Sequence, residues 1–266
     1  MQILKVKTAG GLSMAACYPR TNPKDGFITR AAKSRMTSKA QKFINRKNQR
    51  SNLEFSLAAN LRKGDWFIVL TYDDNHLPKS RADAEKCMVA FMRKLREAKA
   101  PRAYYYNTEG KHADPKPEEN KRLHHHLYIT ADGYTIKSIE QLWGRGHVYG
   151  HKLRFSGELT YGALASYMIK EAEEHPGKRA WHCSRNLKKP DVQTFYVADD
   201  YVILPPDDPN VIVLENSGVN DTAYGRYQEI KTQTLDGYPQ GEVESVYDIP
   251  AKRKRRKGRL QGTVLT

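Results

Sequence analysis

The chain has 266 residues, a formal net charge of +15 at pH 7 and only three cysteines. Three cysteines without paired spacing fit neither a disulfide framework nor a zinc finger, and no stretch approaches the roughly 18 apolar residues of a membrane span. The strongly positive surface favours the phosphate backbone of a nucleic acid as partner. We therefore expect a nucleic-acid-binding protein of the cytoplasm; the alternative is a soluble basic protein that binds nothing specific.

The N-terminal 61 residues divide into two predicted regions. Residues 1–36 show no sustained periodicity and are predicted to form an irregular arm. From Thr37, a suitable N-cap, to about Leu61 the pattern is helical and very basic. Its apolar positions are Phe43, Ile44, Leu53, Leu57 and Leu61, and the helix could lie on a core, on DNA, or on both.

The middle of the chain alternates between strand and helix patterns. Strands are expected at 66–72, 102–110, 121–130 and 147–156, and helices at 81–98, 135–146 and 159–174. Hairpin-like neighbours are mixed with crossover helices, which favours a central antiparallel sheet with helices packed on it. The predicted fold class is therefore α+β, with a main domain at 37–190.

The C-terminal part has a different character. Residues 191–250 contain two apolar runs broken by prolines and acids, which predicts an accessory β-rich extension. Residues 251–266 begin with "AKRKRRKGRL", a cationic run that cannot bury itself and is predicted to be disordered.

Three consecutive histidines stand in the segment "LHHHLYI" at 123–129. Side chains alternate across a strand, so His125 shares a face with the leucines, whereas His124 and His126 point together to the other side, ~7 Å apart along the strand. Two such histidines are often no more than surface residues. They become a candidate metal site only if a third ligand joins them.

Glu109 is the candidate for that third ligand. It ends the preceding strand, so a hairpin would bring its carboxylate to the two imidazoles. Two nitrogens and one hard oxygen with open positions suit Mg²⁺ or Mn²⁺, and they would also suit non-haem iron.

Tyr167 and Lys170 are the candidate nucleophile and its helper. They lie three residues apart in "YGALASYMIKEAEE", and on a helix they would share one face. A free tyrosine has a pKa near 10, and an adjacent ammonium would favour the phenolate and steady an attacked phosphate. The alternative is that Tyr167 packs on the sheet and Lys170 is solvated.

The order of these motifs resembles that of the HUH endonucleases, in particular the rolling-circle replication initiators similar to the filamentous-phage gene II protein. The similar segments run from about residue 40 to 190: "NLRKGDWFIVLTYDDNHLP", "YYYNTEGK", "RLHHHLYI", "LWGRGHVYGHKL", "YGALASYMIKEA" and "RAWHCSRNLKKP". The resemblance implies a ferredoxin-like, RRM-like core of the HUH type.

The resemblance also implies an activity. Such proteins nick one strand of a single-stranded or hairpin origin DNA, form a 5′-phosphotyrosine link and leave a 3′-hydroxyl that primes synthesis. The host helicase and polymerase are the expected protein partners. By this resemblance His124, His126 and Glu109 would hold a divalent metal, Tyr167 would be the nucleophile and Lys170 its helper. Relatives with two tyrosines place one four residues earlier, where this chain has Ala163, and Tyr161 is about 120° around the helix, so a single nucleophile is expected.

Three other functions stay open at this level. An HUH transposase or relaxase shares the histidine pair and the tyrosine. A non-catalytic RRM-like binder would use the tyrosines at 104–106 to stack on bases. An iron-dependent oxygenase would place the same three ligands on a jelly roll.

Overall fold

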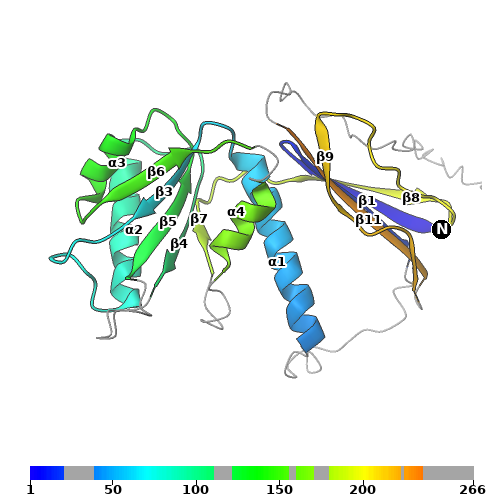
Figure 1. Ribbon diagram of the computed structural model, residues 1–266, viewed down its shortest axis with the longest axis horizontal. Coiled ribbons are helices and arrows are strands. Elements are labelled where there is room, and N and C mark those ends of the chain that lie inside the picture. Colours follow the sequence, from blue (N-terminus) through cyan, green and yellow to red (C-terminus); the bar gives the residue numbers. More distant parts are fainter. Residues whose placement is uncertain (21–38, 111–121, 156–159, 171–179, 223–224, 236–266) are drawn as a thin grey trace, which may run out of the picture.

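The computed structural model describes residues 1–20, 39–110, 122–155, 160–170, 180–222 and 225–235. Within these ranges the chain forms two antiparallel sheets and four helices, and helices α1 and α4 lie between the sheets (Figure 1). The predicted α+β class, with an antiparallel sheet flanked by helices, is confirmed. None of the helices in these ranges combines the length and apolar character that crossing a membrane would require.

The first sheet is built from the middle of the chain. Its strand order is β6-β3-β5-β4-β7, and every neighbouring pair is antiparallel. The strands are β3 (Trp66–Leu70), β4 (Tyr104–Glu109), β5 (His124–Ile129), β6 (Val148–Lys152) and β7 (His182–Cys183). Strand β5, which carries the three histidines, is therefore central, between β3 and β4.

Helices α2 (Arg81–Ala98) and α3 (Ile136–Trp143) cover one face of this sheet. Helix α2 begins at the N-cap Ser80, whose side chain accepts a hydrogen bond from the backbone N–H of Asp83. Its apolar face packs on the sheet, because Ala84, Met88, Phe91, Met92 and Leu95 are all buried. This face of the sheet is a closed apolar core.

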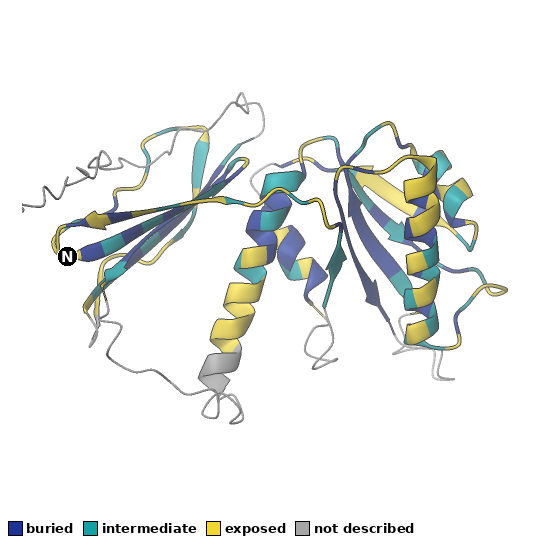
Figure 2. Ribbon diagram, turned by 180° about the vertical axis from the view of Figure 1, so that it is seen from behind, coloured by how far each residue is buried: buried dark blue, intermediate teal, exposed yellow. Residues whose placement is uncertain are grey.

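Helices α1 (Lys39–Asn60) and α4 (Tyr161–Met168) pack against the opposite face. The second half of α1 supplies Leu53, Phe55 and Leu57, all fully buried. Phe43 and Ile44, two apolar positions of the same helix, are instead 71% and 48% exposed. The reason is that the first half of α1 has no sheet beneath it, as the exposed residues there indicate (Figure 2).

The second sheet corrects the prediction for the N-terminal region. Residues 1–36 were expected to be an irregular arm, but β1 (Gln2–Ala9) and β2 (Leu12–Pro19) form a hairpin in the middle of this sheet. The order is β10-β11-β2-β1-β8, with β9 also paired to β11. The remaining strands are β8 (Asp191–Val197), β9 (Val211–Asn216), β10 (Asn220–Thr222) and β11 (Gly225–Thr234).

A buried ion-pair cluster connects the second sheet to α1. The ammonium of Lys231 on β11 lies 3.1 Å from the carboxylate of Glu54 on α1 and 2.7 Å from that of Glu215 on β9. Gly162 on α4 allows a close approach to this cluster, because a Cβ there would lie 2.8 Å from a Glu54 carboxylate oxygen. Two helices and two strands therefore meet at Glu54.

Some predictions fall outside the described residues. These are the basic tail at 251–266 and the parts of the arm and of the extension at 21–36 and 236–250. Strands β8 to β11 lie in the extension predicted to be β-rich. The domain boundaries stay a prediction.

Candidate metal centre

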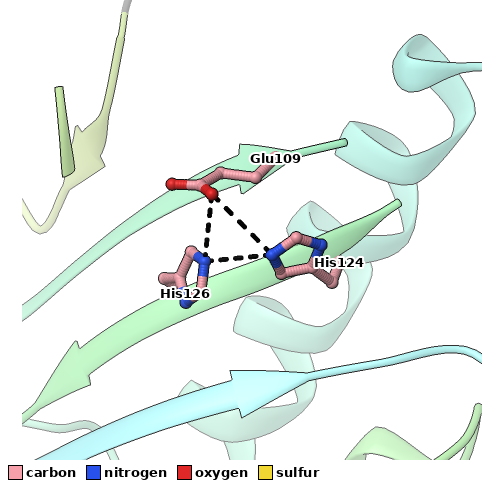
Figure 3. Close-up of side chains that lie close together, drawn as sticks. All are labelled: Glu109, His124 and His126. Carbon is pink, nitrogen blue, oxygen red and sulfur yellow. Dashed lines mark hydrogen bonds and ion pairs between the residues drawn. The ribbon is translucent and has the colours of Figure 1, made fainter. Parts of the chain in front are cut away.

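The three predicted ligands come together at one end of the first sheet. Strands β4 and β5 pair so that Glu109 lies directly opposite His124, and His126 follows on the same face. The Nε2 atoms of the two histidines are 3.1 Å apart (Figure 3). A carboxylate oxygen of Glu109 lies 3.3 Å from His126 Nε2 and 3.8 Å from His124 Nε2. The strand register alone explains this convergence.

These distances fit a single metal ion. The ligand atoms of Glu109, His124 and His126 all lie within 4.8 Å of one another. Two atoms bound to the same ion at about 2.1 Å and roughly 90° apart are separated by about 3.0 Å. The His124 imidazole is also oriented for metal binding. Its Nδ1 lies 2.8 Å from the carbonyl oxygen of Arg122, which can only accept a hydrogen bond. Nδ1 therefore carries the proton, and the Nε2 lone pair faces the centre.

The carboxylate of Glu109 is held in its ionised form. Its side chain is only 3% exposed, and this burial alone would raise its pKa. The hydrogen bond and charge of His126, the amide of Asn107 and the charge of His124 outweigh burial and hold the pKa of Glu109 below its ordinary value. An anionic oxygen is the form that a divalent cation requires.

Two residues that the sequence analysis did not identify support the ligands. The Asn107 amide donates to the second carboxylate oxygen of Glu109 at 3.1 Å and to the carbonyl of Met168 at 3.2 Å. Phe67 stacks on the His126 ring, with centroids 5.8 Å apart and planes 13° apart. The signal for Asn107 was its place two residues before Glu109, which puts it on the same face of β4.

Tyr167 lies beside the candidate metal centre. Its hydroxyl oxygen is 3.3 Å from His126 Nε2, and its ring centroid is 4.7 Å from that of His126. The side chain is 39% exposed, although its helix packs on the sheet. The N-cap Thr160 starts this helix by accepting a hydrogen bond from the backbone N–H of Ala163. The buried ligand His126 and the partly exposed Tyr167 are therefore neighbours.

Lys170 does not share a helix face with Tyr167. The helix was expected at 159–174, but α4 ends at Met168, and Ile169 adopts φ −99° and ψ 5°. Lys170 follows in a turn, where its backbone N–H lies 3.4 Å from the Tyr167 carbonyl, and its side chain is exposed. The prediction that Tyr167 and Lys170 share one helix face was therefore wrong. Residues 171–174 of the expected helix lie outside the described ranges.

The second tyrosine of α4 is enclosed in the core. Tyr161 is 3% exposed, its hydroxyl donates to the Leu61 carbonyl at 3.0 Å, and its ring stacks on Phe155. It faces away from the metal centre, as the sequence spacing predicted.

His125 lies on the other face of β5, with the apolar core. It is fully buried, with Nε2 2.7 Å from the Tyr72 hydroxyl and Nδ1 2.9 Å from the Thr108 hydroxyl. Burial, and then the neighbouring positive groups, lower its pKa to about 3, so it is neutral at pH 7. The three histidines thus divide two to one, as strand alternation predicted.

The alternative of base stacking on the first sheet is not supported. Tyr104, Tyr105 and Tyr106 are at most 8% exposed, so their rings offer no surface to a nucleobase. The oxygenase alternative required a jelly roll, but the three ligands lie on a five-stranded sheet covered by helices.

The comparisons with known proteins agree with this site. Residues 65–172 match the family model of the replication-associated protein ORF2/gene II protein, a segment that includes all three ligands, Tyr167 and Lys170. No curated protein and no solved structure matches the chain. The match spans less than half of the chain and leaves out α1 and the second sheet. Residues 65–172 are therefore similar to the replication-associated protein ORF2/gene II protein family.

Proposed function

We propose that the protein nicks and rejoins one DNA strand, with Tyr167 as nucleophile, to initiate rolling-circle replication. The observation that supports this most strongly is the 3.3 Å distance between the Tyr167 hydroxyl and Nε2 of His126, one of the three candidate metal ligands. A scissile phosphate beside those ligands would be within reach of the hydroxyl. The match to a replication-associated family favours replication over transposition.

The reaction would be a phosphoryl transfer without net loss of a phosphoester bond. The Tyr167 oxygen forms a bond to phosphorus while the bond from phosphorus to the 3′ oxygen breaks. The tyrosine gives up its proton to solvent or a neighbouring base, and the departing 3′ oxygen takes one up. Attack of a 3′-hydroxyl on the phosphotyrosine reverses these steps and rejoins the strand.

Glu109, His124 and His126 would hold Mg²⁺ or Mn²⁺ during this reaction. When bound, such an ion supplies Lewis-acid stabilisation of the phosphate charge and orients the substrate. Asn107 holds the Glu109 carboxylate and, through the Met168 carbonyl, connects it to the end of the helix that carries Tyr167. We propose that Lys170, next to this end, contacts the DNA phosphate as an exposed cation.

The proposed partners follow from the same function. The substrate is a single-stranded or hairpin origin, the 3′-hydroxyl left by nicking is the primer for a host polymerase, and a host helicase would unwind the duplex. The site of action is the host cytoplasm. A net charge of +15 supports binding to the DNA backbone.

The direct test is the formation of a covalent protein–DNA product. Incubation with a pool of end-labelled single-stranded DNA and Mn²⁺ is followed by denaturing electrophoresis. The wild type is expected to form an adduct with the 5′ end of the downstream strand, and Tyr167→Phe is expected to form none. Tyr161→Phe is the matched control from the same helix and is expected to retain the adduct. An adduct in Tyr167→Phe would overturn the assignment of the nucleophile.

A further inference from the structure

Helix α1 changes character halfway along its length. From Leu53 onward it packs into the core, whereas residues 43–49 are all exposed (Figure 2). Positions 39–53 contain five lysines and arginines and no acid. A long helix that leaves half its length unburied gains little from packing there, so this half is available for a partner.

The exposed half of α1 carries a stripe of amide side chains. Asn45, Asn48, Gln49 and Asn52 follow the spacing i, i+3, i+4, i+7, which places them on one side of the helix. They line a groove of about 640 Å³, whose other wall is formed by Ala180, Trp181 and Cys183. Trp181 is half-buried, and its ring centroid lies 6.0 Å from that of Tyr105. The groove thus combines amides with one indole.

A second stripe lies on the side of α1 that faces α4. It consists of Phe43, Arg46, Lys47 and Arg50, with the same helical spacing. These residues line a groove with Ser166 and Ile169, and Ser166 is the neighbour of Tyr167 in the sequence. Helix α1 therefore has a cationic side next to the proposed nucleophile and an amide side facing Trp181.

The cationic side already has partners within the protein. Lys47 lies 3.3 Å from a Glu229 carboxylate oxygen, and Arg50 lies 2.8 Å from one of Glu215. These carboxylates offset part of the positive charge that a phosphate would meet there. On the amide side, the Asn52 side-chain oxygen lies 3.5 Å from the Lys7 ammonium, so a cation rather than an acid borders the groove. The amide side of α1 therefore suits a DNA strand better than the cationic side does.

We propose that this amide groove reads unpaired bases of the DNA strand that reaches Tyr167. Asn and Gln amides both donate and accept, so they can pair with the donor and acceptor pattern of a base edge, adenine above all. An indole offers a stacking surface for a base that has left the helix stack. The Lys7 ammonium beside Asn52 provides positive charge for a phosphate backbone at this groove. The inference rests on the proposed function for the identity of the strand.

The position of the groove supports this role. Neither α1 nor Trp181 lies in the segment 65–172 that matches the family. Helix α1 lies outside this matched segment but contacts α4, which carries Tyr167. It is therefore suited to select a particular origin. Sequence preference and bond cleavage would then be assigned to different parts of the chain.

The first test separates base recognition from chemistry. Single-stranded oligonucleotides are selected from a random pool by the Tyr167→Phe protein in EDTA, and the affinity for the selected sequence is compared with that for a scrambled one by fluorescence anisotropy. The double variant Asn48→Ala/Gln49→Ala is expected to lose about ten-fold or more in affinity for the selected sequence and little for the scrambled one. Alanine favours the helix, so misfolding is not expected.

Gln141→Ala on α3 is the matched control, because Gln141 is an exposed helical amide outside the groove. It is expected to bind both oligonucleotides as the parent does. The inference is overturned if the double variant loses affinity equally for both sequences, if it loses none, or if a duplex of the selected sequence binds as tightly as the single strand. The binding measurement needs neither a metal ion nor Tyr167. Failure of the adduct assay would therefore contradict the proposed nicking function but would leave the result on base recognition unaffected.

The second test concerns stacking. Trp181→Leu is expected to weaken binding of both oligonucleotides by about ten-fold, since stacking tolerates any base, whereas Trp181→Phe is expected to retain most of the affinity. Equal affinities for the leucine and phenylalanine variants would overturn the stacking role of Trp181.

Discussion

The two faces of the first sheet differ in how completely they are covered. On the face under α2 and α3, apolar side chains close over the sheet, and the histidine at its centre, His125, has a hydroxyl partner for each ring nitrogen. On the face under α1 and α4, the cover ends near Tyr167, and three ligand atoms converge on a shared point. The groups that could hold a metal ion lie where the helical cover ends.

The second sheet explains why the cover ends there. It holds α1 through the buried Lys231–Glu54 contact, and the N–H of Tyr161 on α4 lies 3.4 Å from the Gln233 side-chain oxygen on β11. Both helices are thereby fixed relative to the ligands. The open face is then a consequence of how a distant part of the chain positions two helices.

The largest expected effect is on the open face. His126→Ala or His124→Ala is expected to abolish nicking and to lower Mn²⁺ affinity by more than the roughly 10- to 100-fold that loss of an outer-shell partner costs. Isothermal titration with Mn²⁺ measures the affinity, and the adduct assay measures nicking. His147→Ala, an exposed histidine on the segment before β6, is the control. Undiminished Mn²⁺ binding in His126→Ala would contradict the ligand assignment.

The next effect is on the connection between the sheets. Lys231→Met is expected to lower the free energy of unfolding by about 3–5 kcal/mol, because it leaves the buried Glu54 carboxylate without its cation. The double variant Lys231→Met/Glu54→Leu is expected to lose less than the single one, since no charge stays buried there. Urea unfolding measures both. A double variant less stable than the single one would show that packing, rather than the charge, dominates at Glu54.

A smaller effect is expected on the closed face. His125→Leu is expected to lower the free energy of unfolding by about 1–3 kcal/mol, because the buried hydroxyls of Tyr72 and Thr108 each lose a partner. Nicking and Mn²⁺ affinity are expected to be retained. Loss of metal binding in this variant, with the fold intact by circular dichroism, would reverse the roles given to the two faces of β5.

The smallest effect concerns pH. Burial would raise the pKa of Glu215, but the hydrogen bond and charge of Lys231, with Arg50 and Lys47, hold it below the ordinary 4.5. A carboxyl with a depressed pKa in the folded state contributes stability above pH 4.5, and this contribution is lost as the pH falls through the folded value. In urea titrations, the difference in the free energy of unfolding between wild type and Glu215→Gln is therefore expected to narrow as the pH falls below 4.5. A difference that stays constant down to about pH 3 would show that folding does not lower the pKa of Glu215.

The site was largely predictable from the sequence because strand geometry is local. Alternation separated His125 from His124 and His126, and a hairpin was enough to bring Glu109 to them. Asn107 was missed because its role depends on the Met168 carbonyl, which is 61 residues away. The end of α4 was placed too late, since "YGALASYMIKEAEE" continues in a helical pattern beyond Met168.

The N-terminal hairpin was missed although β1 has a readable pattern. In β1, Leu4 and Val6 are buried and alternate with the half-buried Lys5 and Lys7. The alternation is short, and β2 does not continue it, because Ala15, Ala16 and Cys17 are buried in succession. What makes this region a sheet is pairing with β8 and β11, which no local pattern reveals.

That pairing sets an order for folding on the ribosome. The first sheet uses strands between Trp66 and Cys183, whereas β1 and β2 lie between β8 and β11, whose last residue is Thr234. Strands β1 and β2 are made before β8 and β11 and therefore wait for them before they acquire these partners, and such contacts between distant parts of a chain form slowly. We expect the metal ligands to assemble before Lys231 on β11 can pair with Glu54, so the newly made protein would form its candidate metal centre before the second sheet fixes α1.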